Sequence, residues 1–323
     1  MKTSFRLLLF LSVALPGCTG PCLAQRKPVP AFTVIPLGIK GGIDESNLSA
    51  YLCAAGGTND YLCLDAGTLH YGLVIANRTG ALKGPPTAFL RKNVKAYLVS
   101  HPHLDHVAGL VINSPDDSSK SIYGFPFCLS VLQDKYFSWK SWANFGDLGE
   151  QPALKKYHYA AMAPGVETEI LGTSLRATAY FLSHAAPDLS SAFLIRNSDD
   201  YLLYLGDTGA DSIEPSIYLQ QLWTAIAPLI VEKKLKAIFI ETSFPDSQPP
   251  AQLFGHLTPA LLMQELHNLS RVSGGSLRQV PIVITHMKPG GDKEMRIKKE
   301  VLLHNNLHLK ILFPIQGKAM YFP

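Results

Sequence analysis

Short apolar runs recur along this chain and end at glycine or polar residues. Runs of this length predict buried strands, because helices usually need about ten or more residues. The predicted strands are 33–37, 61–65, 94–100, 166–171, 175–182, 190–195, 201–205, 237–240, 280–284, 309–314 and 318–322, with one or two more within 122–132. The segments 166–171 and 175–182 are predicted to form a hairpin around Gly172 and Thr173.

Longer amphipathic segments predict helices at 213–231, 259–269 and 292–304. The second of these begins with Thr258, whose hydroxyl can cap a helix, and Pro259, which suits the first helical position. Shorter segments are interpreted as helical at 107–112 and from residue 46 onwards, and as helical or irregular at 69–77 and 86–92. We therefore interpret the chain as an α/β protein.

The most informative polar stretch is 101–106, His-Pro-His-Leu-Asp-His, which follows the predicted strand 94–100. In extended backbone, residues two apart point the same way, and a turn after His103 can direct Asp105 and His106 to a second point nearby. Imidazole nitrogen and carboxylate oxygen are suitable ligands for zinc, manganese or iron. The loop can therefore supply ligands to two adjacent metal ions.

Three further ligand-type side chains follow predicted strands. His184 follows 175–182, Asp207 follows 201–205, and His286 follows 280–284. The full set is His101, His103, Asp105, His106, His184, Asp207 and His286. Seven ligands suit two metals that share one carboxylate, and Asp207 stands alone on its loop, which makes it the natural bridge. Asp65, at the end of another strand, is interpreted either as a partner that orients a metal-binding histidine or as a turn-capping residue.

The order His-x-His-x-Asp-His, then one His, one Asp and one His, resembles the metallo-β-lactamase superfamily. Within it, the run 101–115, which includes Gly109, Ser114 and Pro115, resembles the signature of class II 3′,5′-cyclic nucleotide phosphodiesterases. The similarity covers nearly all of the chain after the N-terminal segment, through Asp65, His184, Ser190, Ser191, Asp207, Glu241, residues 255–259 and His286.

This resemblance implies an αββα sandwich, two mixed sheets flanked by helices, with a dinuclear metal site at one edge. Carried over position by position, it implies His101, His103 and His184 for one metal, Asp105, His106 and His286 for the other, and Asp207 as the bridge. Zinc is expected because so many ligands are imidazoles, with manganese or iron as alternatives.

The implied reaction is hydrolysis of 3′,5′-cyclic nucleotides, cAMP with cGMP as a further candidate, to nucleoside 5′-monophosphates by a hydroxide that two metals activate. By similarity to a Glu/His pair in phosphodiesterases of the superfamily, His256, oriented by Glu241, would protonate the leaving 3′ oxygen. Asp105 joins these two in the predicted catalytic set. Ser190 or Thr258 would bind a phosphoryl oxygen.

Three alternatives remain open. The first is another hydrolase of the same fold, acting on phosphodiesters or lactams, and the second is an RNA-processing nuclease. The formal net charge is only +4 and comes from scattered Lys and Arg, whereas nucleic-acid binding usually needs a dense basic face, so we expect no nucleic-acid partner. The third is a non-enzymatic periplasmic binding protein, which would not need seven ligands. The oligomeric state is open, with a homodimer among the candidates.

The N-terminus predicts a secretory signal peptide over 1–24. Lys2 and Arg6 precede an apolar run, 7–15, that is too short to span a membrane and is followed by small residues. Cleavage after Ala24 is favoured, and a lipoprotein-type site with a lipid anchor at Cys18 is the alternative. We therefore predict an exported protein of the bacterial periplasm, with 25–323 as a single metallo-hydrolase domain.

Cys53, Cys63 and Cys128 would remain after cleavage at Ala24. Export permits a disulfide, for which Cys53 and Cys63 are the nearest pair, but all three thiols can equally be small buried residues. An aromatic cluster is interpreted either as a wall of a substrate pocket or as a hydrophobic cap under a long loop. It consists of Tyr136, Phe137, Trp139, Trp142 and Phe145.

Overall fold

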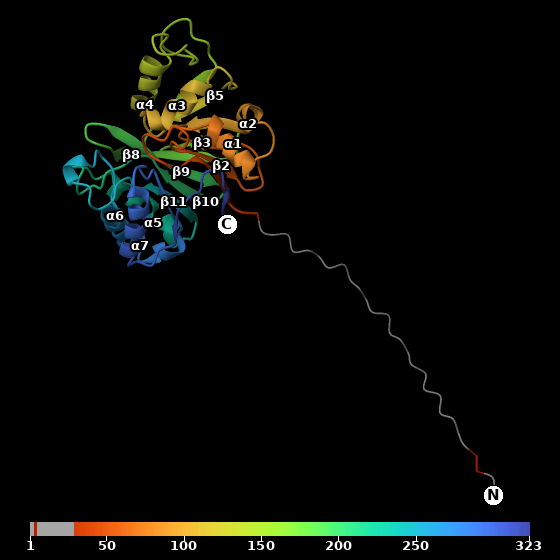
Figure 1. Cartoon of the computed structure of the whole chain (residues 1–323), viewed down its shortest axis with the longest axis vertical. Coiled ribbons are helices and arrows are strands. Elements are labelled where there is room, and N and C mark those ends of the chain that lie inside the picture. The colour runs from red at the N-terminus through yellow and green to blue at the C-terminus, as the bar shows by residue number, and fades with distance from the viewer. Residues whose placement is uncertain (1–2, 5–28) are drawn as a thin grey trace.

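The computed structural model describes residues 3–4 and 29–323. The apolar run 7–15 and both cleavage alternatives, after Ala24 and at Cys18, lie outside the described residues. From Val29 onwards the chain forms two β-sheets that pack face to face, with helices on both outer sides (Figure 1). No helix in the described part of the chain has the length and apolar character that a membrane span requires.

The first sheet has seven strands and is mixed. In spatial order its strands are β14 (Met320–Phe322), β1 (Phe32–Gly38), β2 (Ala50–Ala55), β3 (Tyr61–Leu64), β4 (Val94–Leu98), β5 (Lys120–Gly124) and β6 (Tyr157–Ala161). Pairs from β14 to β3 are antiparallel, and pairs from β3 to β6 are parallel. The parallel half of the sheet contains β4, the strand that leads to residues 101–106, which we call the histidine loop.

The second sheet repeats this plan. Its seven strands, in spatial order, are β13 (Ile311–Leu312), β12 (Ile282–Thr285), β11 (Leu235–Glu241), β10 (Asp200–Leu205), β9 (Leu189–Asn197), β8 (Arg176–Ser183) and β7 (Glu167–Glu169). Pairs from β13 to β10 are parallel, and pairs from β10 to β7 are antiparallel, including the predicted hairpin of β7 and β8. Both sheets are therefore mixed, as predicted.

The helices form the outer layers. Those on the first sheet are α1 (His70–Arg78), α2 (Pro86–Asn93), α3 (Leu104–Asn113) and α4 (Pro126–Val131), which continues into the π-helical turn η1 (Leu132–Tyr136). Those on the second sheet are α5 (Tyr218–Val231), α6 (Pro259–Val272) and α7 (Lys293–His304), with the short turns η2 (Pro250–Gln252) and η3 (Ser276–Gln279). Figure 1 shows the two helix groups on opposite sides of the sheets. The αββα sandwich is thus confirmed.

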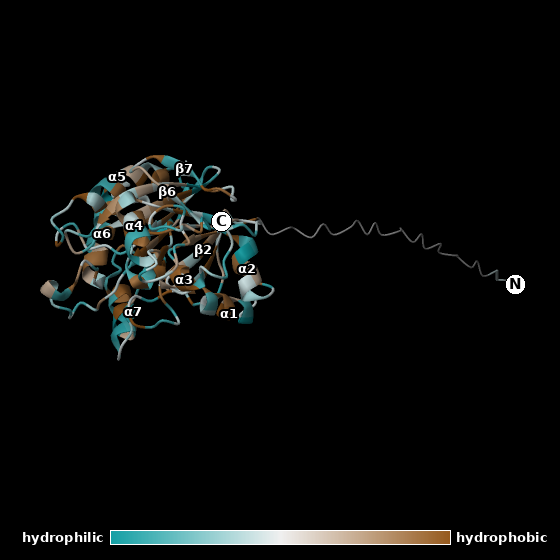
Figure 2. Ribbon diagram, turned by 90° about the horizontal axis from the view of Figure 1, so that it is seen from above, coloured by the Kyte–Doolittle hydropathy of each residue, from teal (hydrophilic) through white to brown (hydrophobic). Residues whose placement is uncertain are grey.

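Three hydrophobic layers hold this arrangement together. One lies between the sheets, where Tyr51 of β2 packs edge-on against Phe239 of β11. The other two lie between each sheet and its own helices. Figure 2 shows the corresponding pattern, with brown concentrated inside the body and teal common on the outer loops and helices. The central strands are covered on both faces, and both faces therefore carry apolar side chains. Burial of this apolar area is the main favourable term in folding.

Two local predictions are wrong. The segment after residue 46 contains the strand β2, not a helix, and all six of its residues are buried between β1 and β3. Of the one or two strands predicted within 122–132, one is present as the end of β5, and the second is wrong because Pro126 occupies the first turn of the helix α4. The strand β6 (Tyr157–Ala161) was not predicted.

The three described cysteines are free and buried, so the disulfide alternative is wrong. Cys53 and Cys63 lie on neighbouring strands, but Cys53 faces the layer between the sheets and Cys63 faces the helices. Side chains on a strand alternate between its two faces, so these two thiols point away from each other.

Candidate metal centre and active site

The seven predicted ligands come together at one edge of the two sheets. β3 and β4 are parallel, as are β10, β11 and β12, so each sheet presents several carboxyl ends at one edge. His101, Asp207 and His286 follow β4, β10 and β12, and His184 follows β8. Carboxyl edges of such strands are where folds of this kind place ligand sites.

The first half of the histidine loop is extended, and its second half forms the start of a helix. His101 and His103 lie in extended chain, and α3 begins at Leu104, so Asp105 and His106 occupy its first turn. The predicted turn after His103 is confirmed. Gly109 allows α3 to approach the loop after β3, because a Cβ at this position would lie 2.7 Å from the Ala66 carbonyl oxygen.

One group of three imidazoles consists of His101, His103 and His184. One donor atom from each lies within 4.8 Å of the others. His184 Nε2 is 3.3 Å from His103 Nδ1. His101 and His184 are buried, whereas His103 is exposed.

A second group consists of Asp105, His106 and His286. His286 Nε2 lies 3.1 Å from His106 Nε2 and 3.2 Å from Asp105 Oδ2. The backbone N–H of Gly42 donates to Asp105 Oδ2 at 2.8 Å and holds this carboxylate in place.

Asp207 lies between the two groups. Its Oδ1 is 3.3 Å from His106 Nε2, and its Oδ2 is 3.3 Å from His286 Nε2. The same Oδ2 is 3.7 Å from His101 Nε2 and 3.8 Å from His184 Nε2. Asp207 is 2 % exposed, so its carboxylate is enclosed by these imidazoles. This is the position that a bridging carboxylate would occupy.

The hydrogen bonds around His106 and His286 fix which ring nitrogen carries the proton. His106 Nδ1 faces Asp65 Oδ2 at 2.8 Å, and a carboxylate can only accept, so Nδ1 donates and Nε2 is a lone pair. The Ser243 hydroxyl donates to Glu241 Oε2 at 2.6 Å and therefore accepts from His286 Nδ1 at 2.9 Å. In the neutral rings the two Nε2 lone pairs would face each other at 3.1 Å, so this arrangement calls for a cation between them, either a proton on His106 or a metal ion.

The first group follows the same rule. His184 Nδ1 donates to the Gly255 carbonyl oxygen at 2.9 Å. The Ser100 hydroxyl donates to Asp65 Oδ2 at 2.9 Å and accepts from His101 Nδ1 at 3.0 Å. His101 Nε2 is left as a buried lone pair with no hydrogen-bond partner. Buried polar atoms are rarely left unpaired, so this one fits a metal ligand.

The electrostatics of the cluster also favour bound cations. Burial lowers the pKa of His101 and of His286, so both imidazoles are neutral, as ligands must be. Burial works against the charged form of His106 as well, but Asp207, Asp65 and Asp105 together raise its pKa well above the usual value. In the metal-free protein the extra proton of His106 lies on Nε2, beside Asp207 Oδ1, where it offsets part of this negative charge. A divalent cation in its place would leave Nε2 as a ligand lone pair.

Glu241 and His256 form a buried pair beside this cluster. Glu241 Oε1 lies 2.7 Å from His256 Nδ1, and it also accepts from the Thr208 backbone N–H at 3.1 Å. Burial raises the pKa of Glu241 to about 7 and lowers that of His256 to about 4. Glu241, His256, Asp207 and His286 also lie within ligand distance of one another, but His256 Nδ1 is already engaged by Glu241.

The two residues predicted to contact substrate lie deeper. Ser190 is in β9 and fully buried, its Oγ has no hydrogen-bond partner, and it lies against Gly206, as does the side chain of Ser100. This position favours a packing role over substrate contact. Thr258 caps α6 as predicted, since its side chain accepts from the Leu261 backbone N–H.

The sequence reasoning missed Ser243, which contacts Glu241, His256 and His286 through one hydroxyl. A serine two residues after Glu241 at the end of a predicted strand was the available signal. For Asp65 the sequence left two roles open, an orienting partner of a metal-binding histidine and a turn-capping residue. The hydrogen bond to His106 confirms Asp65 as the partner that orients a histidine of the site.

Comparison with solved structures identifies the fold. The crystal structure of unliganded yeast PDE1 superimposes with a TM-score of 0.80 at 23 % identity, and the alignment covers 91 % of this chain and 100 % of that one. The metallo-β-lactamase fold protein YhfI from Bacillus subtilis gives a TM-score of 0.61 at 16 % identity, over 91 % of this chain and 99 % of that one. The chain therefore has the metallo-β-lactamase fold, and the site lies at the edge where the resemblance predicted it.

The family model of class-II cAMP phosphodiesterases matches residues 82–307. A 3′,5′-cyclic-nucleotide phosphodiesterase of Aliivibrio fischeri is 39 % identical over 308 residues, which cover 90 % of this chain and 93 % of that protein. This chain therefore belongs to the class-II cAMP phosphodiesterase family. The enzyme class predicted from residues 101–115 is confirmed, and the lactam and nuclease alternatives lose their support.

Proposed function

We propose that this enzyme hydrolyses both cAMP and cGMP to nucleoside 5′-monophosphates at a dinuclear metal centre. His101, His103 and His184 would hold one divalent cation, and Asp105, His106 and His286 would hold the other, with Asp207 shared. The observation that carries the proposal is the set of Nε2 lone pairs of His101, His106, His184 and His286, each fixed by a hydrogen bond at Nδ1 and directed at Asp207.

When bound, two such cations supply a nucleophilic water at neutral pH and neutralise charge on the phosphoryl group. The chain's own residues supply the rest. Asp65, Ser243 and the Gly255 carbonyl hold the imidazoles in the tautomer that leaves Nε2 free. His256 would donate its Nε2 proton to the leaving 3′ oxygen while its Nδ1 takes the proton of the Glu241 carboxyl group, 2.7 Å away, so His256 stays neutral and Glu241 ends as the carboxylate.

Zinc is the proposed metal, because five of the seven ligands are imidazoles and zinc takes nitrogen ligands readily. Manganese and iron are the rivals. Elemental analysis of the purified protein distinguishes them, and two zinc ions per chain is the expected result. One ion per chain would overturn the dinuclear proposal, and two ions of manganese or iron would overturn only the choice of metal.

Product analysis tests the reaction itself. The enzyme should convert cAMP and cGMP to the 5′-monophosphates, and a chelator should abolish this conversion until metal is added back. A 3′-monophosphate product would contradict the assignment of the leaving oxygen. Turnover of cAMP without turnover of cGMP would restrict the proposal to one nucleotide.

We also propose export to the bacterial periplasm, with cleavage after Ala24, on the sequence of residues 2–24. The intact mass of the protein purified from expressing cells tests this. A mass that begins at Gln25 supports plain cleavage, and a mass that begins at a lipid-modified Cys18 supports the anchor. A mass that retains Met1 or Lys2 would contradict export. Light scattering on the same sample tests the homodimer.

A further inference from the structure

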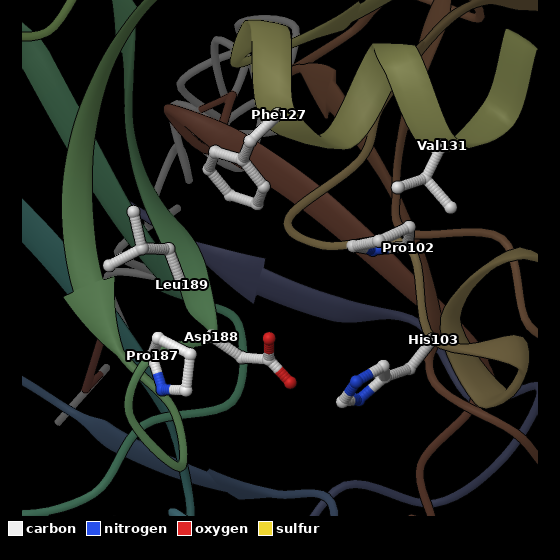
Figure 3. A pocket seen from close by; sticks show the side chains of 7 residues that line it. All are labelled: Pro102, His103, Phe127, Val131, Pro187, Asp188 and Leu189. Atoms are coloured by element: carbon white, nitrogen blue, oxygen red, sulfur yellow. The ribbon is translucent and has the colours of Figure 1, made fainter. Parts of the chain in front are cut away.

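A cavity of about 270 Å³ opens beside the metal centre (Figure 3). Its walls are mostly apolar, and the apolar side chains are Pro102, Phe127, Val131, Pro187 and Leu189. Phe127 and Val131 come from α4, whereas Pro187 comes from the segment that joins β8 to β9, and Leu189 is the first residue of β9. The cavity therefore lies between the helix layer of the first sheet and an edge of the second.

His103 connects this cavity to the metal centre. Its side chain is part of the cavity wall, and its Nδ1 lies 3.3 Å from His184 Nε2. Pockets that bury a whole drug-sized ligand usually measure ~300–1,000 Å³, so this one suits part of a ligand. A phosphate held at the metal centre would place the remainder of its molecule here.

The polar groups of the cavity are gathered at the end near the metals. Figure 3 shows the Asp188 carboxylate and the His103 imidazole directed toward each other, with Phe127 on the opposite side of the space. From the metal centre outwards the surroundings thus change from ligands to a hydrogen-bond acceptor and then to apolar walls. A cyclic nucleotide has the same order of phosphate, ribose and base.

The backbone holds Asp188 in a defined place. The Asp188 N–H donates to the Ala185 carbonyl at 3.2 Å, and its own carbonyl accepts from the His184 N–H at 3.2 Å. Buried Glu214 accepts from the Ala186 N–H at 3.0 Å and from the Ser183 hydroxyl at 3.2 Å. This segment is therefore tied to His184, yet the Asp188 carboxylate makes no hydrogen bond or ion pair within residues 29–323.

We propose that this cavity is the nucleoside subsite, an inference that rests on the function proposed above. The Asp188 carboxylate accepts a hydrogen bond from the ribose 2′-hydroxyl, which neighbours the leaving 3′ oxygen. An ionised carboxylate is an acceptor only, and a ribose hydroxyl is the donor that it requires at this place. The base lies against Phe127.

Base tolerance follows from the same geometry. The side chains around Phe127 are apolar, so they contact the face of a ring and bring no polar side-chain group to its edge. Contact with an aromatic side chain is tolerant of base identity, because every base has a π-face. The enzyme should therefore accept adenine and guanine with similar kcat/KM and should distinguish ribose from 2′-deoxyribose.

The decisive experiment compares kcat/KM on cAMP and on 2′-deoxy-cAMP. The native enzyme should prefer cAMP by about tenfold, the low end for a hydrogen bond to a charged group, because Asp188 is exposed. Asp188→Ala should lower kcat/KM on cAMP by the same factor and leave little preference between the two substrates. Asp188→Asn keeps an acceptor oxygen and should restore part of the preference.

Asp199→Ala is the matched control. Asp199 is an exposed aspartate in the turn between β9 and β10, at the opposite end of β9 from Asp188. Its replacement removes the same charge and should leave both substrates unaffected. Phe127→Ala should lower kcat/KM on cAMP and cGMP equally, by about tenfold relative to bis(p-nitrophenyl) phosphate, which has no nucleoside.

Each contrary outcome has a separate meaning. If the native enzyme hydrolyses no cyclic nucleotide, the proposed function fails and this inference fails with it. If cAMP is hydrolysed but Asp188→Ala keeps the native preference for ribose, only the subsite is overturned. If Asp188→Ala instead changes the ratio of cAMP to cGMP, the carboxylate contacts the base, and the ribose assignment is wrong. A preference for one base that Phe127→Ala removes would overturn the base tolerance.

Discussion

Asp65 Oδ2 lies 2.8 Å from His106 Nδ1, although the two residues are 41 positions apart in the chain. The same carboxylate accepts from the Tyr204 hydroxyl at 2.6 Å and from the Ser100 N–H at 2.7 Å. Tyr204 belongs to β10 in the second sheet, so one buried carboxylate joins both sheets to the histidine loop. Asp65 has a φ of +53°, a left-handed conformation that aspartate tolerates better than most residues.

Asp65→Asn should weaken metal binding. Asparagine keeps the shape of the side chain but has one acceptor oxygen in place of two, and its NH2 group can donate to His106 Nδ1 and move the ring proton to Nε2. Loss of such an orienting partner typically costs ~10–100-fold in metal affinity. Competition with a chromophoric zinc chelator measures this. Asp60→Asn, at an exposed aspartate that pairs with Lys95, is the control and should bind metal normally.

His256→Ala should separate two kinds of substrate. A general acid contributes roughly 10²–10⁴ in rate when the leaving group is a poor one such as the 3′ oxygen of cAMP. The p-nitrophenolate of bis(p-nitrophenyl) phosphate leaves without a proton, so its turnover should fall far less. The exposed His158 provides the control, His158→Ala, which should leave both rates unchanged. Equal losses on both substrates would remove His256 from the role of acid.

Gly41→Ala should displace one residue of the second ligand group, although no ligand is itself replaced. A Cβ on Gly41 would lie 2.2 Å from Cε1 of the His286 ring, so the ring has to move away from Asp207 and Asp105. We expect bound metal to fall from two ions per chain toward one, with a large loss of activity, as measured by elemental analysis and cAMP turnover. Full metal content would contradict this prediction, because it would show that His286 can still bind metal beside the added methyl group.

Gly274→Ala is the comparison for this variant. A Cβ on Gly274 meets nothing within 4 Å, but its φ is +61°, so alanine there carries a strain of about 1–2 kcal/mol. This change should lower stability modestly and leave the metal content at two. The pair of variants therefore separates a local effect on His286 from a general loss of stability.

Much of the site could be predicted because its ligands follow apolar strands. A strand that ends in histidine or aspartate places that side chain at an edge of its sheet, and the edges of parallel strands coincide. His101, His184, Asp207 and His286 all obey this rule. The pattern could not show which loops of different sheets meet, and the family resemblance supplied that information.

The failures arise where the surrounding structure, and not the local sequence pattern, decides the outcome. Ala50–Ala55 contains three alanines, which favour helices, and only its enclosure between β1 and β3 makes it a strand. Ser243 acts through Glu241 and His286, and the second of these is 43 residues away, beyond the reach of any local pattern. Cys53 and Cys63 are close in sequence, but the alternation of side chains along β2 and β3 separates them.

A buried ion pair far from the site provides a test of stability alone. Lys120 Nζ lies 2.6 Å from Asp117 Oδ1, and the other carboxylate oxygen accepts from the hydroxyls of Tyr97 at 2.6 Å and Tyr157 at 2.9 Å. The Lys120 and Asp117 side chains are 2 % and 0 % exposed. They lie at the amino end of β5, the edge of the first sheet opposite to the metal centre.

Lys120→Met should lower the free energy of unfolding by about 3 kcal/mol, because it leaves the Asp117 carboxylate charged, buried and without a cation. The figure is at the low end of the range for broken buried pairs, since Tyr97, Tyr157 and the Ser118 N–H still donate to Asp117. Urea unfolding of the metal-loaded protein measures the change. Lys120→Met combined with Asp117→Asn removes the unpaired charge and should recover part of the loss. A double variant no more stable than Lys120→Met would show that the cost lies in the contacts that the ammonium makes with the Tyr97 ring and the Leu90 carbonyl, and not in the unpaired charge of Asp117.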